Sequence, residues 1–125
     1  AYKFYDHVIE RGGKVTLQAI DGPETEWASP LAAFEAVLKH EQFVTSRINA
    51  LMDIAHELRD HASASFLQWY IDEQVEEEAN AEQICQKLRL IGDNPNGLFM
   101  VDQELAARVF VVPVGMPAAV GGGAA

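Results

Sequence analysis

The sequence predicts an all-α protein dominated by two long helices. In residues 29–57 and 62–91, apolar side chains recur at steps of three, four and seven, the spacing of one helix face. Segments rich in glycine and proline separate these stretches from their neighbours. The chain has 125 residues, of which 49% are hydrophobic, so its length and composition suit one domain with its own core.

The charge of the chain restricts its partners. It carries 19 acidic and 9 basic residues, a formal net charge of −10. Binding to phosphate backbones needs clustered Lys and Arg, so the charge argues against nucleic acid as a partner. A negative field concentrates cations instead, and the balance is that of an acidic, soluble, cytoplasmic protein.

Cysteine usage and hydropathy exclude further classes. Cys85 is the only cysteine, so an intrachain disulfide and a cysteine-rich zinc or iron–sulfur site are excluded. No apolar run approaches the roughly 18 residues of a membrane span, and the mixed aromatic and charged N-terminus does not resemble a signal peptide. We therefore expect no membrane partner and a cytoplasmic location.

The first eleven residues predict the end of a helix. Tyr2, Tyr5 and Ile9 lie three to four residues apart, and glycines at 12 and 13 stop the helix. Nothing before Tyr2 resembles an N-cap, so we expect the chain to begin in mid-helix, as a fragment or processed product would. Residues 12–28 then predict a connection that, at ~3.3 Å per residue, reaches ~55 Å, enough for a crossover between parallel helices.

Two long helices should follow this crossover. Ser29 caps the first, Pro30 fits its first turn, and the helix should end near Glu57, a length of ~42 Å at ~1.5 Å per residue. After a short break, in which Asp60 can act as the next cap, the second helix runs over residues 62–91. So short a link makes the two helices antiparallel neighbours.

The C-terminal part predicts a break, a short helix and a tail. Residues 92–97 form a strong breaker, and a short amphipathic helix is expected near residues 102–110. We expect residues 1–110 to make up the helical domain and residues 111–125, rich in Gly, Ala, Pro and Val, to be a flexible tail.

Three polar residues interrupt the predicted apolar faces. Glu41 continues the seven-residue spacing of the stripe on the first long helix, and Gln74 and Glu77 do so on the second. Burying an unpartnered carboxylate costs several kcal/mol, and a cation between carboxylates removes that cost. Carboxylate and amide oxygens suit hard metals such as iron, so these residues predict a metal site. Alternatively, the acids are protonated, or they pair with Arg47 or Lys39.

Further acids extend this region. Glu73 and Glu76 lie four and one residues before Glu77 and can lend oxygens to a second, more exposed cation site, whereas Glu78 is expected on a solvated face. The four histidines are expected to face solvent or cap helices. Cys85 is expected to be an inert, semi-buried residue beside the apolar stripe.

At these residues the sequence resembles the prokaryotic ferritins. Residues 66–78, FLQWYIDEQVEEE, are similar to their fourth-helix signature, and residues 39–42, KHEQ, to a segment of their third helix. Residues 97–105 resemble the entry to their short fifth helix, and residues 26–31 the end of their long crossover. The likeness runs from residue 1 to about Arg108.

The resemblance implies a ferritin-like four-helix bundle with a long crossover and a short fifth helix. It implies a homo-oligomeric cage, usually of twenty-four subunits, that oxidises Fe(II) with oxygen and stores the ferric product. By position, Glu41, Gln74 and Glu77 match catalytic ligands of a dinuclear non-haem iron centre. Glu73 and Glu76 match ligands of a third iron site, and Gln74 favours a non-haem ferritin, so no haem is expected.

The sequence departs from the family at its N-terminus. The family's first helix supplies a glutamate and a tyrosine, and its second a Glu-x-x-His, a motif that occurs nowhere in this sequence. The resemblance therefore implies a bundle truncated at the N-terminus, with half of the iron centre. The chain would be a ferroxidase with the missing helices and inactive alone. The alternatives are a non-catalytic cation-binding or shell-forming fragment and a purely structural helix–helix module.

Overall fold

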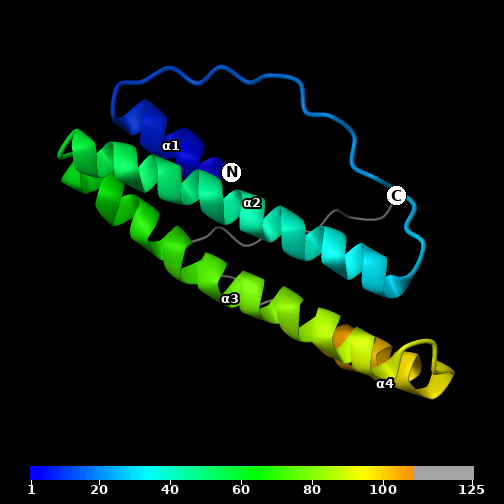
Figure 1. The fold of residues 1–125 in the computed structure, drawn as a ribbon. Coiled ribbons are helices and arrows are strands. Elements are labelled where there is room, and N and C mark those ends of the chain that lie inside the picture. Colours follow the sequence, from blue (N-terminus) through cyan, green and yellow to red (C-terminus); the bar gives the residue numbers. More distant parts are fainter. Residues whose placement is uncertain (109–125) are drawn as a thin grey trace.

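The computed structural model describes residues 1–108, which form four helices and no strand (Figure 1). The helices are α1 (Tyr2–Glu10), α2 (Pro30–Glu57), α3 (His61–Ile91) and α4 (Pro95–Ala106). The predicted all-α class is confirmed. The tail predicted for residues 111–125 lies outside the described residues.

The two long helices begin at the predicted caps. The Ser29 hydroxyl accepts a hydrogen bond from the Ala32 amide at 3.1 Å, and Pro30 occupies the first turn of α2. At the start of α3, an Asp60 carboxylate oxygen accepts from the Ser63 amide at 3.2 Å. Each cap therefore satisfies an amide that has no partner inside its helix.

A tight turn joins α2 to α3. Arg59 has a positive φ of 53°, a conformation that glycine usually supplies after a helix. The Asp60 amide donates to the Ala55 carbonyl at 2.8 Å, and the Arg59 amide donates to the His56 carbonyl at 3.0 Å. These two bonds close the last turn of α2 and reverse the chain, which makes α2 and α3 antiparallel as predicted (Figure 1).

The core lies along the seam between α2 and α3. Its buried apolar residues are Ile48, Met52 and Ala55 from α2 and Leu67, Ala81, Ile84, Cys85 and Leu88 from α3. Cys85 has no exposed surface, so the prediction of a semi-buried cysteine is wrong. Positions 67, 74, 81 and 88 are spaced by seven, so one line of side chains on α3 faces α2 over most of its length.

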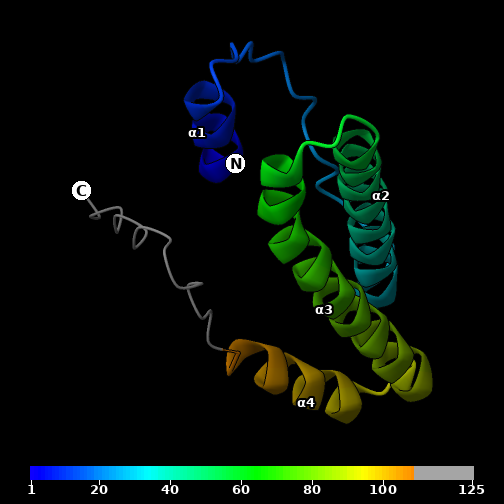
Figure 2. The same ribbon diagram turned by 90° about the vertical axis from the view of Figure 1, so that its left-hand side faces the viewer.

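The helix α1 packs beside the first half of α3 through long side chains (Figure 2). The Phe4 ring lies 5.1 Å from Phe66 and 4.6 Å from Tyr70, measured between ring centroids. His7 stacks on Phe66 at 4.3 Å, and its Nε2 lies 3.0 Å from the Ser63 hydroxyl. His7 is half-buried, so the expectation that it faces solvent or caps a helix is wrong.

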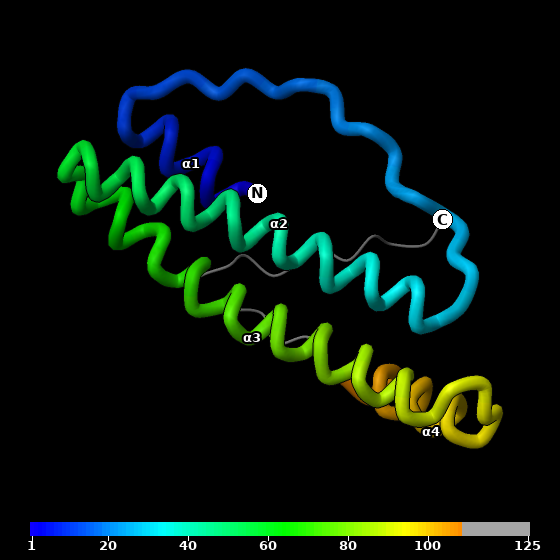
Figure 3. The backbone as a smooth tube through the Cα atoms, in the orientation of Figure 1, coloured from blue at the N-terminus to red at the C-terminus, as the bar shows by residue number. Residues whose placement is uncertain are grey.

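The connection from α1 to α2 runs along the length of the bundle (Figure 3). It starts after Glu10, at the end where α2 meets α3, and reaches the opposite end before Pro30. As a result, α1 and α2 point in the same direction, as a crossover requires.

The short helix α4 begins earlier than the sequence predicts. It starts at Pro95, inside the expected breaker, because Asn94 caps it. The side-chain oxygen Oδ1 of Asn94 accepts hydrogen bonds from the amides of Asn96 and Gly97. Pro95 suits the first turn of a helix as well as it suits a break. The end of the predicted helix, residues 109 and 110, lies outside the described residues. Of the helices described, none is both long and apolar enough to span a membrane.

Candidate metal-binding site

Gln74 is the buried polar residue of the α2–α3 seam. It is 9% exposed and occupies the seven-residue line between Leu67 and Ala81. Its Nε2 lies 3.2 Å from each of three oxygens on α2: the Glu41 carbonyl, a Glu41 carboxylate oxygen and the Thr45 hydroxyl. The structure thus brings together two of the predicted site residues, Glu41 and Gln74, from the two long helices.

The chemistry of these partners determines the orientation of the Gln74 amide. A peptide carbonyl and an ionised carboxylate can only accept hydrogen bonds, so the NH₂ group must face them. The amide oxygen, which is the atom able to bind a cation, therefore points away from Glu41. Among residues 1–108 it makes no hydrogen bond.

Glu41 is half-buried and forms no ion pair with a described residue. The ion pairs within residues 1–108 are Arg11–Asp60, Lys87–Glu104 and Arg89–Glu35. Neither Lys39 nor Arg47 pairs with Glu41 or with Glu77, so the alternative ion pairs do not form within residues 1–108. One Glu41 carboxylate oxygen accepts from Gln74, which leaves the other oxygen available to a cation.

Glu77 is exposed, so the prediction that it lies on the buried face is wrong for residues 1–108. A helix turns about 100° per residue, so Glu77 projects roughly 60° away from Gln74. α2 covers the Gln74 side of α3, while α1 and α4 lie near the two ends of α3 (Figure 2). Glu77 lies between these ends, where none of the described helices covers it.

The burial of the other acidic residues differs from the prediction. Glu73 is half-buried and Glu76 is exposed, whereas Glu78, expected on a solvated face, is half-buried. Glu78 lies one turn after Gln74, on the side that faces α2. Over residues 1–108, no three or more His, Cys, Asp or Glu side chains converge as a metal-holding group. The roles of Glu73, Glu76 and Glu77 as ligands therefore stay predictions.

The sequence pattern does not single out two further polar side chains on these helices, Thr45 and Tyr70. Thr45 lies four residues after Glu41, a spacing that places both on one face of α2 and could have been noticed. The Tyr70 hydroxyl is buried and has no hydrogen-bond partner among the described residues. Burial raises the pKa of Tyr70, so the phenol stays protonated.

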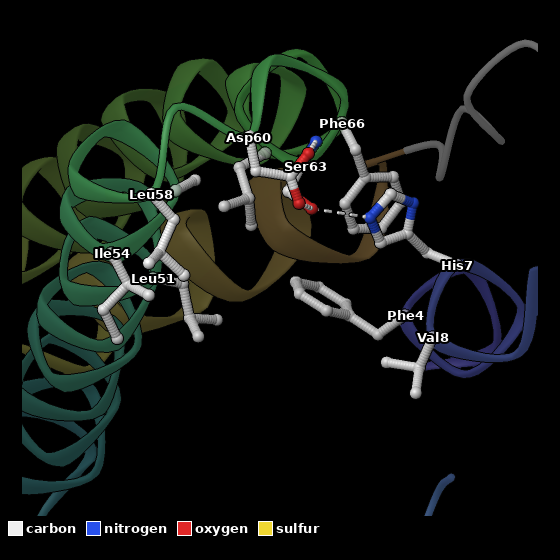
Figure 4. A pocket seen from close by; sticks show the side chains of 11 residues that line it. Phe4, His7, Val8, Leu51, Ile54, Leu58, Asp60, Ser63 and Phe66 are labelled. Atoms are coloured by element: carbon white, nitrogen blue, oxygen red, sulfur yellow. Dashed lines mark hydrogen bonds between the residues drawn. The ribbon is translucent and has the colours of Figure 1, made fainter. Parts of the chain in front are cut away.

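The cavity at the hairpin end of the bundle does not suit a cation. It has a volume of about 210 Å³ and lies among α1, α2 and α3 (Figure 4). Phe4 and Val8 reach into it from α1, Leu51 and Ile54 line it from α2, and Leu58 lines it from the turn after α2 (Figure 4). Its polar lining residues are His7, Asp60 and Ser63, and all three are already paired. The Ser63 hydroxyl is hydrogen-bonded to both His7 and Asp60, and Asp60 also forms an ion pair with Arg11. The Glu41–Thr45–Gln74 cluster is therefore the better candidate for a metal site.

The sequence matches one family model, described as a ferritin-like domain, over residues 1–91. It is 46% identical over 108 residues to a bacterial non-heme ferritin of Staphylococcus saprophyticus and 40% identical to that of Staphylococcus aureus. Each alignment covers 86% of this chain but 65% of the relative, so the chain spans less than two thirds of the length of these relatives.

Solved structures give the same comparison. A structure of the open-pore ferritin of Archaeoglobus fulgidus matches with a TM-score of 0.83 and 52% sequence identity, and covers 86% of this chain and 67% of that protein. A closed form of the same ferritin, engineered by site-directed mutagenesis, also matches with a TM-score of 0.83, over 88% of this chain.

Proposed function

Because the chain belongs to the ferritin family, we propose that it acts in iron storage and detoxification, through oxidation of Fe(II) at a dinuclear carboxylate centre. The observation that carries this proposal is the contact between Gln74 and Glu41 across the seam of the two long helices. This contact supports the proposal because both side chains, a carboxylate and an amide, carry oxygens that suit hard cations.

In the proposed site, Fe(II) is the substrate and the protein supplies oxygen ligands. Glu41 contributes the carboxylate oxygen that Gln74 does not use, Gln74 contributes its amide oxygen, and Glu77 contributes a carboxylate from the neighbouring turn of α3. Two Fe(II) held side by side would each give one electron to the same O₂ molecule, which would take up two protons from water to form hydrogen peroxide while both irons become Fe(III). The carboxylates would offset the added positive charge. Glu73 and Glu76 form a further, more exposed cation site on the same helix.

The chain supplies part of the centre, so oxidation depends on ligands from elsewhere. No Glu-x-x-His occurs in the sequence, and the described residues form no group of three acidic, histidine or cysteine ligands. We therefore propose that catalysis requires an assembly that brings further ligands to Glu41 and Gln74. We propose that this assembly is a homo-oligomeric cage in the cytoplasm, because the chain belongs to the ferritin family.

The partial iron centre also favours a second function, without catalysis. A chain with one wall of the site can bind cations, or form part of a shell, without oxidising iron. Oxygen uptake during aerobic Fe(II) addition separates the two functions. With the complete site, oxygen is consumed in step with iron and turnover continues beyond the bound iron. The 125-residue chain alone is expected to match the buffer rate, and fast turnover by a mass-verified chain would contradict that expectation.

The binding site itself is tested by anaerobic titration with Fe(II). Replacing both Glu41 and Glu77 by Ala removes two carboxylates and should abolish tight binding. Glu82→Ala, which removes an exposed carboxylate elsewhere on α3, is the matched control and should bind as the unmodified chain does. If the double variant keeps the same stoichiometry and affinity, the assignment of the site is wrong.

A further inference from the structure

Thr45 contacts the proposed site without being one of its metal ligands. It is half-buried on α2, one turn after Glu41, and its hydroxyl oxygen lies 3.2 Å from Nε2 of Gln74. The Gln74 NH₂ group has two hydrogens and faces three acceptors. Two of these acceptors belong to Glu41, which is itself expected to bind the cation. The third acceptor, Thr45, is not expected to bind it.

The three acceptors differ in what a cation does to them. When Glu41 binds a cation through one carboxylate oxygen, the whole carboxylate loses electron density, and its other oxygen becomes a poorer acceptor for the Gln74 amide. The Glu41 carbonyl belongs to the backbone of α2, and threonine, being β-branched, has few side-chain rotamers in a helix. The carbonyl and the Thr45 hydroxyl therefore stay in place when the Glu41 carboxylate turns toward a cation.

We infer that Thr45 is a positioning residue, which holds the Gln74 nitrogen against α2 so that the amide oxygen is presented to a cation. This inference rests on the proposed function of the site and adds a residue to it. With Thr45 in place, the orientation of the amide does not depend on the Glu41 carboxylate. Without the hydroxyl, one amide hydrogen is left with only the weakened Glu41 carboxylate whenever Glu41 binds the cation, and a poorly paired buried donor costs binding energy.

Two substitutions at this position separate the hydroxyl from the shape of the side chain. Thr45→Val keeps the branched shape and removes the hydroxyl, while Thr45→Ser keeps the hydroxyl. Ser46→Ala is the matched control, because the Ser46 hydroxyl donates to the Phe43 carbonyl of its own helix and does not reach Gln74.

The first measurement needs no cation. In the full chain labelled with ¹⁵N-glutamine, Gln74→Leu identifies the side-chain NH₂ signals of Gln74 by their loss. Thr45→Val should speed hydrogen exchange of those signals several-fold, while Thr45→Ser and Ser46→Ala should leave it within about twofold of the unmodified chain. Unchanged exchange in Thr45→Val overturns the inference.

The second measurement is anaerobic titration with Mn²⁺, a hard cation that oxygen ligands also accept. Thr45→Val should weaken binding about three- to tenfold, and Thr45→Ser should restore it. Faster exchange without weaker Mn²⁺ binding would also overturn the inference, since Thr45 would then hold the amide without serving the cation. Unchanged Mn²⁺ binding in Gln74→Leu would instead refute the proposed site, and the exchange measurement would still report on Thr45.

Discussion

At the scale of single residues, Gly97 allows α4 to pack closely on the end of α3. A Cβ at this position would lie 2.9 Å from Cβ of Ile91 and 3.0 Å from its Cγ2. These atoms are next to the backbone, so no side-chain rotation relieves the contact. Gly97, two residues after Pro95, is therefore small because two helices meet there.

We predict that Gly97→Ala destabilises the docking of α4. The added methyl group must push α4 away from Ile91, which should cost about 1–3 kcal/mol, as overpacking usually does. Gly22→Ala is the control, because a Cβ at Gly22 meets nothing within 4 Å. Hydrogen exchange of the α4 amides measures the effect, and equal protection in both variants would contradict the contact with Ile91.

Cys85 illustrates a residue whose chemistry is suppressed by its position. It is fully buried in the seam, and burial raises the pKa of its thiol, which disfavours the reactive thiolate. We predict that thiol reagents label Cys85 at the rate at which α2 and α3 separate, while an exposed Ser46→Cys reacts at once. Labelling of Cys85 under native conditions as fast as that of the control would show that the seam is open.

At the scale of helices, α1 depends on side chains that reach the start of α3. Arg11 forms an ion pair with Asp60 at 2.9 Å, and Asp60 also accepts from the amide and hydroxyl of Ser63, which in turn contacts His7. The same carboxylate therefore caps α3 and holds the end of α1. Loss of its charge should affect both helices together.

We predict that acid weakens this junction through Asp60. The hydrogen bonds from Ser63, and then the charge of Arg11, hold the pKa of Asp60 below its ordinary value of 3.8. Because the folded pKa is the lower one, the stabilisation is complete above the unfolded value and is lost as the pH falls through the folded pKa. Asp60→Asn should remove this component of the acid dependence, measured by thermal melting between neutral pH and about pH 2.

The control for this prediction is Asp53→Asn, which changes an exposed carboxylate on α2. Its melting temperature should follow pH as that of the unmodified chain does. If Asp60→Asn and Asp53→Asn show the same acid dependence, the junction does not rely on the Asp60 charge.

At the scale of the whole molecule, large apolar side chains remain uncovered on the long helices. Val37 and Leu51 on α2, 14 residues apart, are 45% and 43% exposed, Leu58 just after α2 is 72% exposed, and Val75 on α3 is 68% exposed. Scattered exposed apolar residues are ordinary, but a continuous stripe on a long helix marks an interface. Two antiparallel helices cover one flank of each other and leave the other flanks open.

We predict that this chain does not persist as a well-folded monomer. It should associate with further bundle helices or with a second copy, since association removes the exposed stripe from water and surrounds the core polar residues. Sedimentation of the mass-verified chain tests this expectation, and Leu51→Glu, which places a charge in the stripe, should weaken the association. A compact monomer that melts cooperatively at micromolar concentration would contradict the prediction.

Features that depend on near neighbours in the chain were predictable. The caps at Ser29 and Asp60 follow from a residue and the two or three amides after it, and the antiparallel hairpin follows from the short link between two amphipathic stretches. The start of α4 was missed because Asn94 and Pro95 suit both a break and a helix start. In the structure α4 also packs closely against Ile91 through Gly97, and local sequence preferences do not predict that contact.

The tertiary structure alone decided which polar residues of the stripe meet. Glu41, Gln74 and Glu77 each continue a seven-residue spacing of apolar positions, but Gln74 is buried against α2 whereas Glu77 is exposed. His7 likewise finds Ser63, 56 residues later in the chain. Periodicity determines which side chains share a helix face, a local property of the backbone. Whether that face is covered depends on which other helix lies beside it, and contacts between distant segments decide that.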